Sequence, residues 1–294
     1  MQFENRQVVE GVNVTKVHPL KQFMQLLIAT VILVVIVVIV LRLSGAWLAK
    51  RIPFSFEVQV MDTLDIDFGD AAPDSDMRQY LNALGEKLEV AMELPEGMTT
   101  NIHYSTDAVF NAFATVGGNL MFYRGLLEEL PHENALAMVL AHEIAHVQHR
   151  DPIAGLGGGV VSSVALIALA GQSGTGPAGK VLNNAGVLTS IQFTRRMEQE
   201  ADAAAIAAVN RVYGHVNGAD MLFHVLQRKG ASRQDIPDTI RRFTETHPAL
   251  EDRIDAIAAR VSAEGWDDSG ELTPLPEKFK LCLLYTSPSP RDRG

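Results

Sequence analysis

The chain has 294 residues, of which 47% are hydrophobic and 20% charged, and its formal net charge is −10. This composition suits one globular domain with additional segments, and the absence of a long Lys/Arg run excludes the basic surface that nucleic acid requires. The single cysteine, Cys282, excludes an intrachain disulfide and a cysteine-based metal site.

The N-terminal region contains the most apolar run of the sequence. Residues 1–22 form a short polar tail, and Phe23–Leu41 follows with 19 residues that carry no charge. At about 1.5 Å per residue, a helix of this length just spans a hydrocarbon core of about 30 Å. We therefore predict a transmembrane anchor over 23–41. A cleaved signal peptide is the alternative, but its apolar region would be shorter, about 7–15 residues.

Strands and then helices are predicted after the anchor. Residues 42–73 are expected to be a linker with short strands, because Phe54–Phe68 partly alternates between apolar and polar residues. Helical spacing of apolar residues predicts a helix over 74–93. A second helix is expected from Pro131, a favoured first helical position, to about His149. Further strands are predicted over 99–104, 109–115 and 119–123, with a turn at Gly117-Gly118, and further helices near 180–210, 218–229 and 249–262.

A metal-binding pattern, His142-Glu143-Ile144-Ala145-His146, lies within the second of these helices. Residues four apart share one helical face, so both imidazoles can face one metal ion while Glu143 serves as a general base. Apolar neighbours predict that this helix is buried, and buried histidines and carboxylates need a compensating partner. A metal ion is such a partner. An exposed helix with ordinary polar residues is the alternative.

A catalytic zinc ion also needs a third protein ligand and an open fourth position. Glu198, which lies 52 positions after His146, is the candidate. Asp202 lies four residues further on the same predicted face, where it can accept the N–H of a liganding histidine and fix its tautomer. We therefore expect one Zn²⁺ ion per chain, bound by His142, His146 and Glu198.

The stretch Pro152–Gly179 contains no charged residue and is rich in small residues. It is compatible with a second membrane span, a membrane-dipping hairpin or a buried helix. A single crossing would place Glu198 on the opposite side of the bilayer from His142 and His146. We therefore interpret residues 152–179 as an apolar hairpin that does not span the membrane.

Together these motifs resemble the gluzincin peptidases, and more closely the HtpX, BepA and LoiP group with its CAAX-prenyl-endopeptidase relatives. Three further segments agree. Asn111–Gly118 resembles the strand that precedes the active-site helix in this family, and Gly125-Leu126-Leu127 follows it at the expected distance. His247-Pro248 with Arg253-Ile254 resembles the C-terminal motif of the family. The similarity covers roughly residues 75–262 in four separated motifs.

The resemblance implies roles for further residues. Glu143 is the catalytic base. His247 lies near the metal, where it polarises the substrate or closes the site as a switch. Arg253 can anchor its helix to an acidic partner and so set the position of His247. The residues implied to pair with an extended substrate are Gly117, Gly118, Asn119, Leu120 and Met121.

These predictions describe an α+β, zincin-like metallopeptidase domain over residues 74–265, mainly helical with a small sheet and preceded by one transmembrane helix. Residues 266–281 are expected to be a C-terminal extension. Residues 282–294 resemble a translated sequencing adapter and are left out of the fold; a Pro/Ser-rich tail is the alternative.

The predicted function is that of a membrane-anchored zinc endopeptidase, which by analogy of fold acts on unfolded or damaged proteins in envelope quality control. A chaperone-like or regulatory zinc-binding protein and a membrane scaffold with a structural metal are the alternatives, and the intact Glu143 argues against both. Basic residues flank both ends of the anchor, so its orientation rests on the resemblance. We expect a single-pass protein of the bacterial inner membrane with a periplasmic catalytic domain; a cytoplasm-facing domain is the alternative. The oligomeric state is left open.

Overall fold

The computed structural model describes residues 20–33, 36, 51–64, 75–155, 191–230, 236–248 and 250–276. Residues 20–33 form an exposed helix, and most of the remaining predicted anchor lies outside the described residues. Within the described ranges, no helix combines the length and the hydropathy that a membrane crossing requires. The predicted hairpin beyond Gly155 and the adapter-like segment 282–294 also lie outside these ranges.

A three-stranded sheet forms one layer of the domain. It consists of β1 (Asn101–Ser105), β2 (Ala112–Ala114) and β3 (Asn119–Tyr123) in the order β1-β3-β2. β1 runs parallel to β3, and β2 runs antiparallel to it. The central strand is therefore β3, which is hydrogen-bonded on both sides. This topology corrects the predicted substrate-pairing segment Gly117–Met121: its strand has no open edge, whereas β2 is an edge strand of the described sheet.

A tight turn, η1 (Val116–Gly118), joins β2 to β3. Gly117 and Gly118 have φ angles of 73° and 77°, a backbone region that L side chains rarely adopt. A Cβ atom at Gly118 would also lie 2.3 Å from the carbonyl oxygen of Thr99. The turn predicted at this Gly-Gly pair is confirmed, and the second position requires glycine. The strand before it is shorter than the predicted 109–115.

Helices account for most of the described chain. The central helix begins at Glu133 rather than at Pro131, because the Nδ1 atom of His132 caps it by accepting a hydrogen bond from the amide of Ala135 at 3.2 Å. Helices that agree with predicted regions are α3 (Asp76–Met92), α5 (Glu133–Gln148), α10 (Arg195–Tyr213), α11 (Met221–Lys229) and α13 (Leu250–Glu264). Besides α2 (Phe54–Leu64), three were not predicted as helices: α4 (Arg124–Leu127), α6 (Asp151–Gly155) and α12 (Asp238–Thr246).

The prediction of short strands over Phe54–Phe68 was wrong for the residues that the structure describes. They form a helix, α2 (Phe54–Leu64). Its buried residues, Glu57, Val60 and Met61, recur at helical spacing and form one face. That face packs against η1. A long-range contact thus decides between helix and strand where the local pattern is ambiguous.

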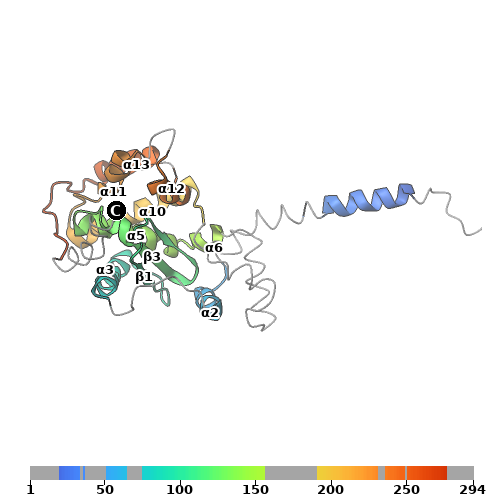
Figure 1. Ribbon diagram of the computed structural model, residues 1–294, viewed down its shortest axis with the longest axis horizontal. Helices are drawn as coiled ribbons and strands as arrows, with labels where there is room; N and C mark the ends of the chain where they lie inside the picture. The colour runs from blue at the N-terminus through green and yellow to red at the C-terminus, as the bar shows by residue number, and fades with distance from the viewer. Residues whose placement is uncertain are drawn as a thin grey trace, which may run out of the picture.

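The core of the domain is organised around α5. Figure 1 shows α5 between the sheet with α3 on one side and α10, α11 and α13 on the other. Every residue from Asn134 to Val147 is buried, so α5 has no solvent-facing stripe, as expected for a helix enclosed on all sides. The polar residues on α5 are therefore held inside the protein.

The segment after α13 also packs onto the domain. The amide of Glu133 donates to the carbonyl oxygen of Thr273 at 2.9 Å, and the amide of Thr273 donates to Oδ1 of Asn134 at 2.8 Å. Leu275 is buried and belongs to the main core. Residues 266–276 therefore complete the surroundings of the first turn of α5.

Candidate metal centre

Two histidines on α5 form one side of the centre. His142 and His146 lie one helical turn apart, and their Nε2 atoms approach to 3.0 Å. Their side chains are almost fully buried, at 7% and 0% exposure. Two imidazole nitrogens this close together inside a protein need a cation, or a proton between them, to be compatible.

The third side chain comes from α10. Thr194 caps this helix by accepting a hydrogen bond from the amide of Met197, and Glu198 follows in the first turn. The Glu198 carboxylate is fully buried, with its oxygens 3.5 Å from Nε2 of His142 and 3.4 Å from Nε2 of His146. The structure thus brings the three predicted metal ligands together from two helices.

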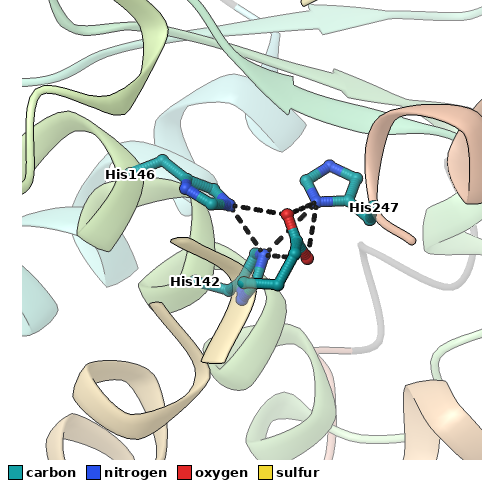
Figure 2. Close-up of side chains that lie close together, drawn as sticks. His142, His146 and His247 are labelled. Atoms are coloured by element: carbon teal, nitrogen blue, oxygen red, sulfur yellow. Dashed lines mark hydrogen bonds and ion pairs between the residues drawn. The ribbon is translucent and has the colours of Figure 1, made fainter. Parts of the chain in front are cut away.

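A fourth donor, His247, lies at the C-terminal end of α12. Its Nδ1 atom is 3.1 Å from Oε1 of Glu198 and 3.4 Å from Nε2 of His142. Figure 2 shows the three labelled imidazole rings converging on one carboxylate. The donor atoms of His142, His146, Glu198 and His247 all lie within 4.8 Å of one another.

Glu143 lies beside this cluster without a hydrogen-bond partner for its carboxylate. The residue is fully buried, and neither carboxylate oxygen has a hydrogen-bond partner within the described part of the chain. The closest basic atom recorded for it is Nε2 of His247, at 3.6 Å. A buried carboxylate whose oxygens have no partner among the described residues is costly for folding, so the position agrees with the base expected from the sequence.

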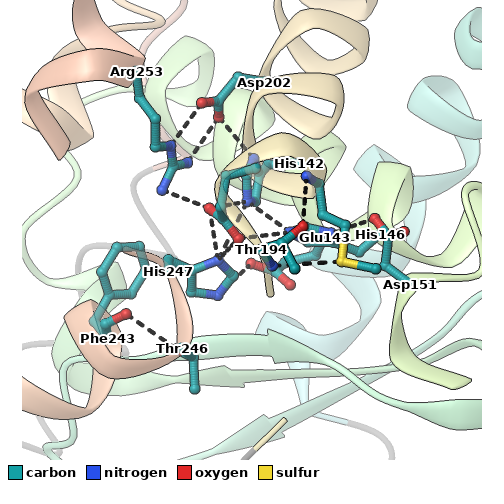
Figure 3. A network of polar contacts seen from close by, with 12 residues as sticks. His142, Glu143, His146, Asp151, Thr194, Asp202, Phe243, Thr246, His247 and Arg253 are labelled. Carbon is teal, nitrogen blue, oxygen red and sulfur yellow. Dashed lines mark hydrogen bonds and ion pairs between the residues drawn. The ribbon is translucent and has the colours of Figure 1, made fainter. Parts of the chain in front are cut away.

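Asp202 and Arg253 support the ligands from behind. Asp202 lies one turn after Glu198 on α10, with Oδ1 2.8 Å from Nδ1 of His142. Arg253 on α13 donates to both Asp202 oxygens, at 2.7 and 2.8 Å, and its Nη1 atom lies 2.6 Å from Glu198. Figure 3 shows this network around the imidazole of His142. Both residues occupy the supporting positions expected from the sequence.

One supporting residue was not predicted. Oδ2 of Asp151, at the start of α6, lies 3.0 Å from Nδ1 of His146. Each histidine of α5 therefore has a carboxylate on its outer nitrogen, which fixes the tautomer that directs Nε2 to the cluster. The sequence held a signal for this residue, because Asp151 is the only acidic residue between Glu143 and Glu198.

Aromatic rings enclose the cluster. Phe193 stacks on the ring of His146, with centroids 3.9 Å apart, and Phe243 stacks on His247 at 4.9 Å. The amide of Phe193 also donates to the carbonyl oxygen of Thr246. These contacts restrain the imidazole planes, and burial of the cluster strengthens the electrostatic interactions inside the centre.

The charge distribution favours a bound cation. Burial would lower the pKa of His142, but the carboxylates of Asp202 and Glu198 outweigh this effect and raise the pKa to about 10. Burial would raise the pKa of Glu198, yet His247 and Arg253 hold it well below its usual range. The carboxylates thus attract a positive charge, and a metal ion would displace the proton of His142 when it binds.

The residues present fit a zinc ion. Catalytic zinc sites combine three protein donors of the nitrogen, oxygen or sulfur type with an open position. Two histidines and Glu198 provide three such donors here, His247 reaches the remaining side, and each histidine of α5 has a carboxylate behind it. Glu143, the base expected from the sequence, lies beside this set with no hydrogen-bond partner among the described residues.

Comparison with known proteins identifies the family. The model of Peptidase family M48 matches residues 75–261. The chain belongs to Peptidase family M48. This result confirms the resemblance seen in the sequence motifs, and the cluster of three histidines and one glutamate agrees with a metal-dependent member of the family.

Similar proteins agree with this assignment. The mitochondrial metalloendopeptidase OMA1 of Schizosaccharomyces pombe is 30% identical over 185 residues, which cover 61% of this chain and 53% of that protein. The β-barrel assembly-enhancing protease of Yersinia pestis is 28% identical over 216 residues, which cover 63% of this chain and 39% of the relative. The chain therefore spans about half or less of the length of these relatives. The predicted enzyme class, a zinc metalloendopeptidase, agrees with the family and with both names.

Proposed function

We propose that this M48 family member is a membrane-anchored zinc endopeptidase that hydrolyses peptide bonds of unfolded or damaged proteins. The observation that carries the proposal is the buried, unpartnered carboxylate of Glu143 beside the converging donors of His142, His146 and Glu198. A structural metal site has no use for such a base. A hydrolytic site requires one.

In this proposal His142, His146 and Glu198 hold the metal. The chemistry that a zinc ion supplies when bound is polarisation of the scissile carbonyl and a lower pKa of water, near about 7. Glu143 accepts a proton from the attacking water and passes it to the nitrogen of the leaving amine. The oxygen of the water first bonds to the carbonyl carbon and the C=O π bond opens. When the amine nitrogen has taken the proton, the C=O bond re-forms and the C–N bond breaks, which leaves a carboxylic acid and an amine. Because neither Glu143 oxygen has a competing hydrogen bond from the residues that the structure describes, either can take this proton.

The edge strand β2 provides a backbone for the substrate to pair with. The carbonyl of Asn111 accepts from the amide of Tyr123, and the amide of Thr115 donates to the carbonyl of Asn119. In the segment 111–115, the backbone N–H and C=O groups of the odd-numbered residues therefore point toward β3. Those of Ala112 and Ala114 point away from β3, toward the outer edge of the sheet. Both alanines are fully buried, so an extended peptide would have to displace what covers this edge before it paired there through its main chain, with little dependence on sequence.

A pocket lies next to this edge. It has a volume of about 250 Å³ and reaches from Phe113 and Tyr123 on the sheet to Thr246, the neighbour of His247. Aromatic rings on one side and polar groups on the other suit varied side chains. This breadth supports unfolded polypeptides as the substrate class rather than one defined sequence.

His247 is the residue that would set the level of activity. Its Nδ1 atom lies among the metal donors, which supports a removable fourth ligand, while its Nε2 atom faces Glu143 and supports a role beside the reacting carbonyl. Occupation of the fourth position also favours the second candidate function, a chaperone-like or regulatory zinc protein with little proteolysis.

The location belongs to the same proposal. The apolar run over 23–41 supports a single-pass anchor in a bacterial inner membrane. Relatives named for β-barrel assembly support a periplasmic catalytic domain, and a cytoplasm-facing domain is the alternative.

Metal analysis combined with a cleavage assay tests this function. The purified full chain should contain one zinc ion and cleave casein, an unfolded substrate. Glu143→Gln should keep the zinc and lose cleavage, whereas Glu198→Ala should lose the zinc. If Glu198→Ala retained one zinc ion with unchanged affinity, the ligand assignment would be wrong. If Glu143→Gln cleaved casein normally, the hydrolytic mechanism would be wrong.

A further inference from the structure

The helix α2 lies outside the M48 family match, which begins at residue 75, yet it inserts a carboxylate into the domain. Glu57 is only 3% exposed. Burying a carboxylate is unfavourable unless it is fully paired. Each of its two oxygens has a partner in the domain. One partner lies in the turn after β2, and the other lies just after α5.

The first partner is the turn that follows the edge strand. Oε2 of Glu57 accepts a hydrogen bond from the amide of Gly117 at 3.1 Å. A Cβ atom at Gly117 would lie 2.9 Å from the Met61 side chain and 3.2 Å from the carbonyl oxygen of Glu57. The turn η1 therefore lies directly against α2, and Glu57 fixes the end of the segment that contains β2.

The second partner is Arg150, at the end of α5. Its Nε atom donates to Oε1 of Glu57 at 2.7 Å, and its Nη2 atom donates to the same oxygen and to the carbonyl of Ile52 at 2.8 Å. The guanidinium also lies over the ring of Phe54. Arg150 has a φ angle of 62°, which is unfavourable for a residue with a side chain. Its contacts with α2 offset that cost.

The strained residue determines where the next carboxylate points. At Arg150 the chain leaves α5 and reverses into α6, so that Asp151 returns toward the helix it has just left. Its Oδ2 atom then lies 3.0 Å from Nδ1 of His146. Ile52, just before α2, packs against Ile153 of α6. This contact is a second link between the α2 region and the chain that follows Arg150.

We propose that Glu57 is a positioning residue of the peptidase site, through which α2 holds Asp151 against His146 and fixes the edge strand. The inference rests on the proposed metal centre. It assigns a part in that centre to an element between the predicted anchor and the family domain. Displacement of α2 would release the carboxylate behind one metal ligand and the backbone that pairs with substrate at the same time.

The test separates positioning from stability. Glu57→Gln removes the charge and leaves the partly buried side chain of Arg150 without its counter-ion. The double variant Glu57→Leu/Arg150→Met replaces the pair by apolar side chains, a change that commonly restores stability. Val60→Ala is the matched control, because it shortens another buried side chain of α2 without touching the ion pair. For each full-length variant we would measure the urea midpoint, the zinc dissociation constant by chelator competition, hydrogen exchange at the Gly117 amide, and kcat and KM separately.

We expect both Glu57 variants to bind zinc about 10–100-fold more weakly, as for loss of a group behind a ligand. Both should raise KM and exchange the Gly117 amide faster, including the double variant at restored stability. Val60→Ala should lower the urea midpoint and leave zinc affinity unchanged.

The inference would be overturned if folded Glu57→Gln bound zinc with wild-type affinity. It would also be overturned if Val60→Ala, at a urea midpoint equal to that of Glu57→Gln, lost as much zinc affinity. If the double variant does not fold, the comparison of Glu57→Gln with Val60→Ala decides. The proposed function fails separately, since it requires the wild-type protein to bind zinc and to lose cleavage in Glu143→Gln.

Discussion

Arg253 places one cation between two buried carboxylates. Its planar guanidinium binds Asp202 through two nitrogens and Glu198 through the third. The charge of Asp202 is thereby balanced without a metal, and Asp202 can hold His142 in a fixed orientation. Burial would lower the pKa of Arg253, but the neighbouring carboxylates raise it further above its ordinary value. Arg253 therefore stays charged whether or not a metal is present.

Replacement of Arg253 by lysine should weaken the metal centre, because an ammonium group cannot bind a carboxylate through two parallel hydrogen bonds. We expect zinc affinity to fall about 10–100-fold, in line with other groups behind metal ligands. Arg253→Met should also destabilise the fold by about 3–5 kcal/mol, since two buried carboxylates lose their partner. Chelator competition and urea unfolding measure the two effects. Wild-type zinc affinity in Arg253→Lys would show that a single charge suffices.

His247→Ala distinguishes the two roles open to this histidine. Because Nδ1 lies among the donors, we expect the fourth position to open and cleavage of casein, and of the chain itself, to rise. A fall of about 10²–10³ in rate would instead identify a hydrogen-bond donor to the developing oxyanion. Unchanged activity and zinc affinity would remove His247 from the site. The assay compares initial rates at equal zinc content.

At the scale of elements, Glu133 joins three helices at the start of α5. Its carboxylate accepts hydrogen bonds from the hydroxyls of Tyr80 on α3 and Tyr213 on α10. The negative charge also lies in the first turn, where the helix dipole favours it. Burial, and then the Glu133 carboxylate, raise the pKa of both tyrosines.

This arrangement predicts sensitivity to alkaline pH. Both tyrosines have a higher pKa in the folded state than the unfolded value of about 10, so the stability they contribute is complete below that pH. It is lost as the pH rises above it, because only the unfolded chain readily releases these protons. Absorbance of tyrosinate during an alkaline titration should show these two tyrosines among the groups that ionise only with unfolding; the pKa of Tyr123 is also raised, chiefly by burial. In Tyr80→Phe/Tyr213→Phe this late-ionising pair should be missing.

Elements that are determined by the residue pattern of their own segment could be predicted from the sequence. Elements that are determined by contacts with distant segments could not. Pro131 predicted the start of α5 to within two residues, the spacing of His142 and His146 predicted the face that they share, and the Gly-Gly pair predicted the turn η1. The helix α2 was predicted as strands because its alternation is resolved only by packing on η1. The strand order β1-β3-β2 follows from pairing between distant segments. Asp151 was missed because the reversal at Arg150 leaves no periodic signal.

At the scale of the whole molecule, the orientation across the membrane can be tested directly. We expect the N-terminus in the cytoplasm, one span at about 23–41 and the catalytic domain in the periplasm. Protease added to spheroplasts should then digest the domain while the inner membrane is intact. A domain that is protected until the membrane is lysed would support the cytoplasm-facing alternative.

The hydrogen bonds between Thr273 and the first turn of α5 have a consequence for biosynthesis. Thr273 lies 131 positions after His142, so the metal-binding helix is made long before the segment that completes its N-terminal end. At about 5–20 residues per second, the delay during translation is about 7–26 s. Glu198 and Arg253 are also synthesised within this interval. A nascent chain on the ribosome therefore carries the His-Glu-x-x-His helix for this interval before the residues that complete its surroundings have been made.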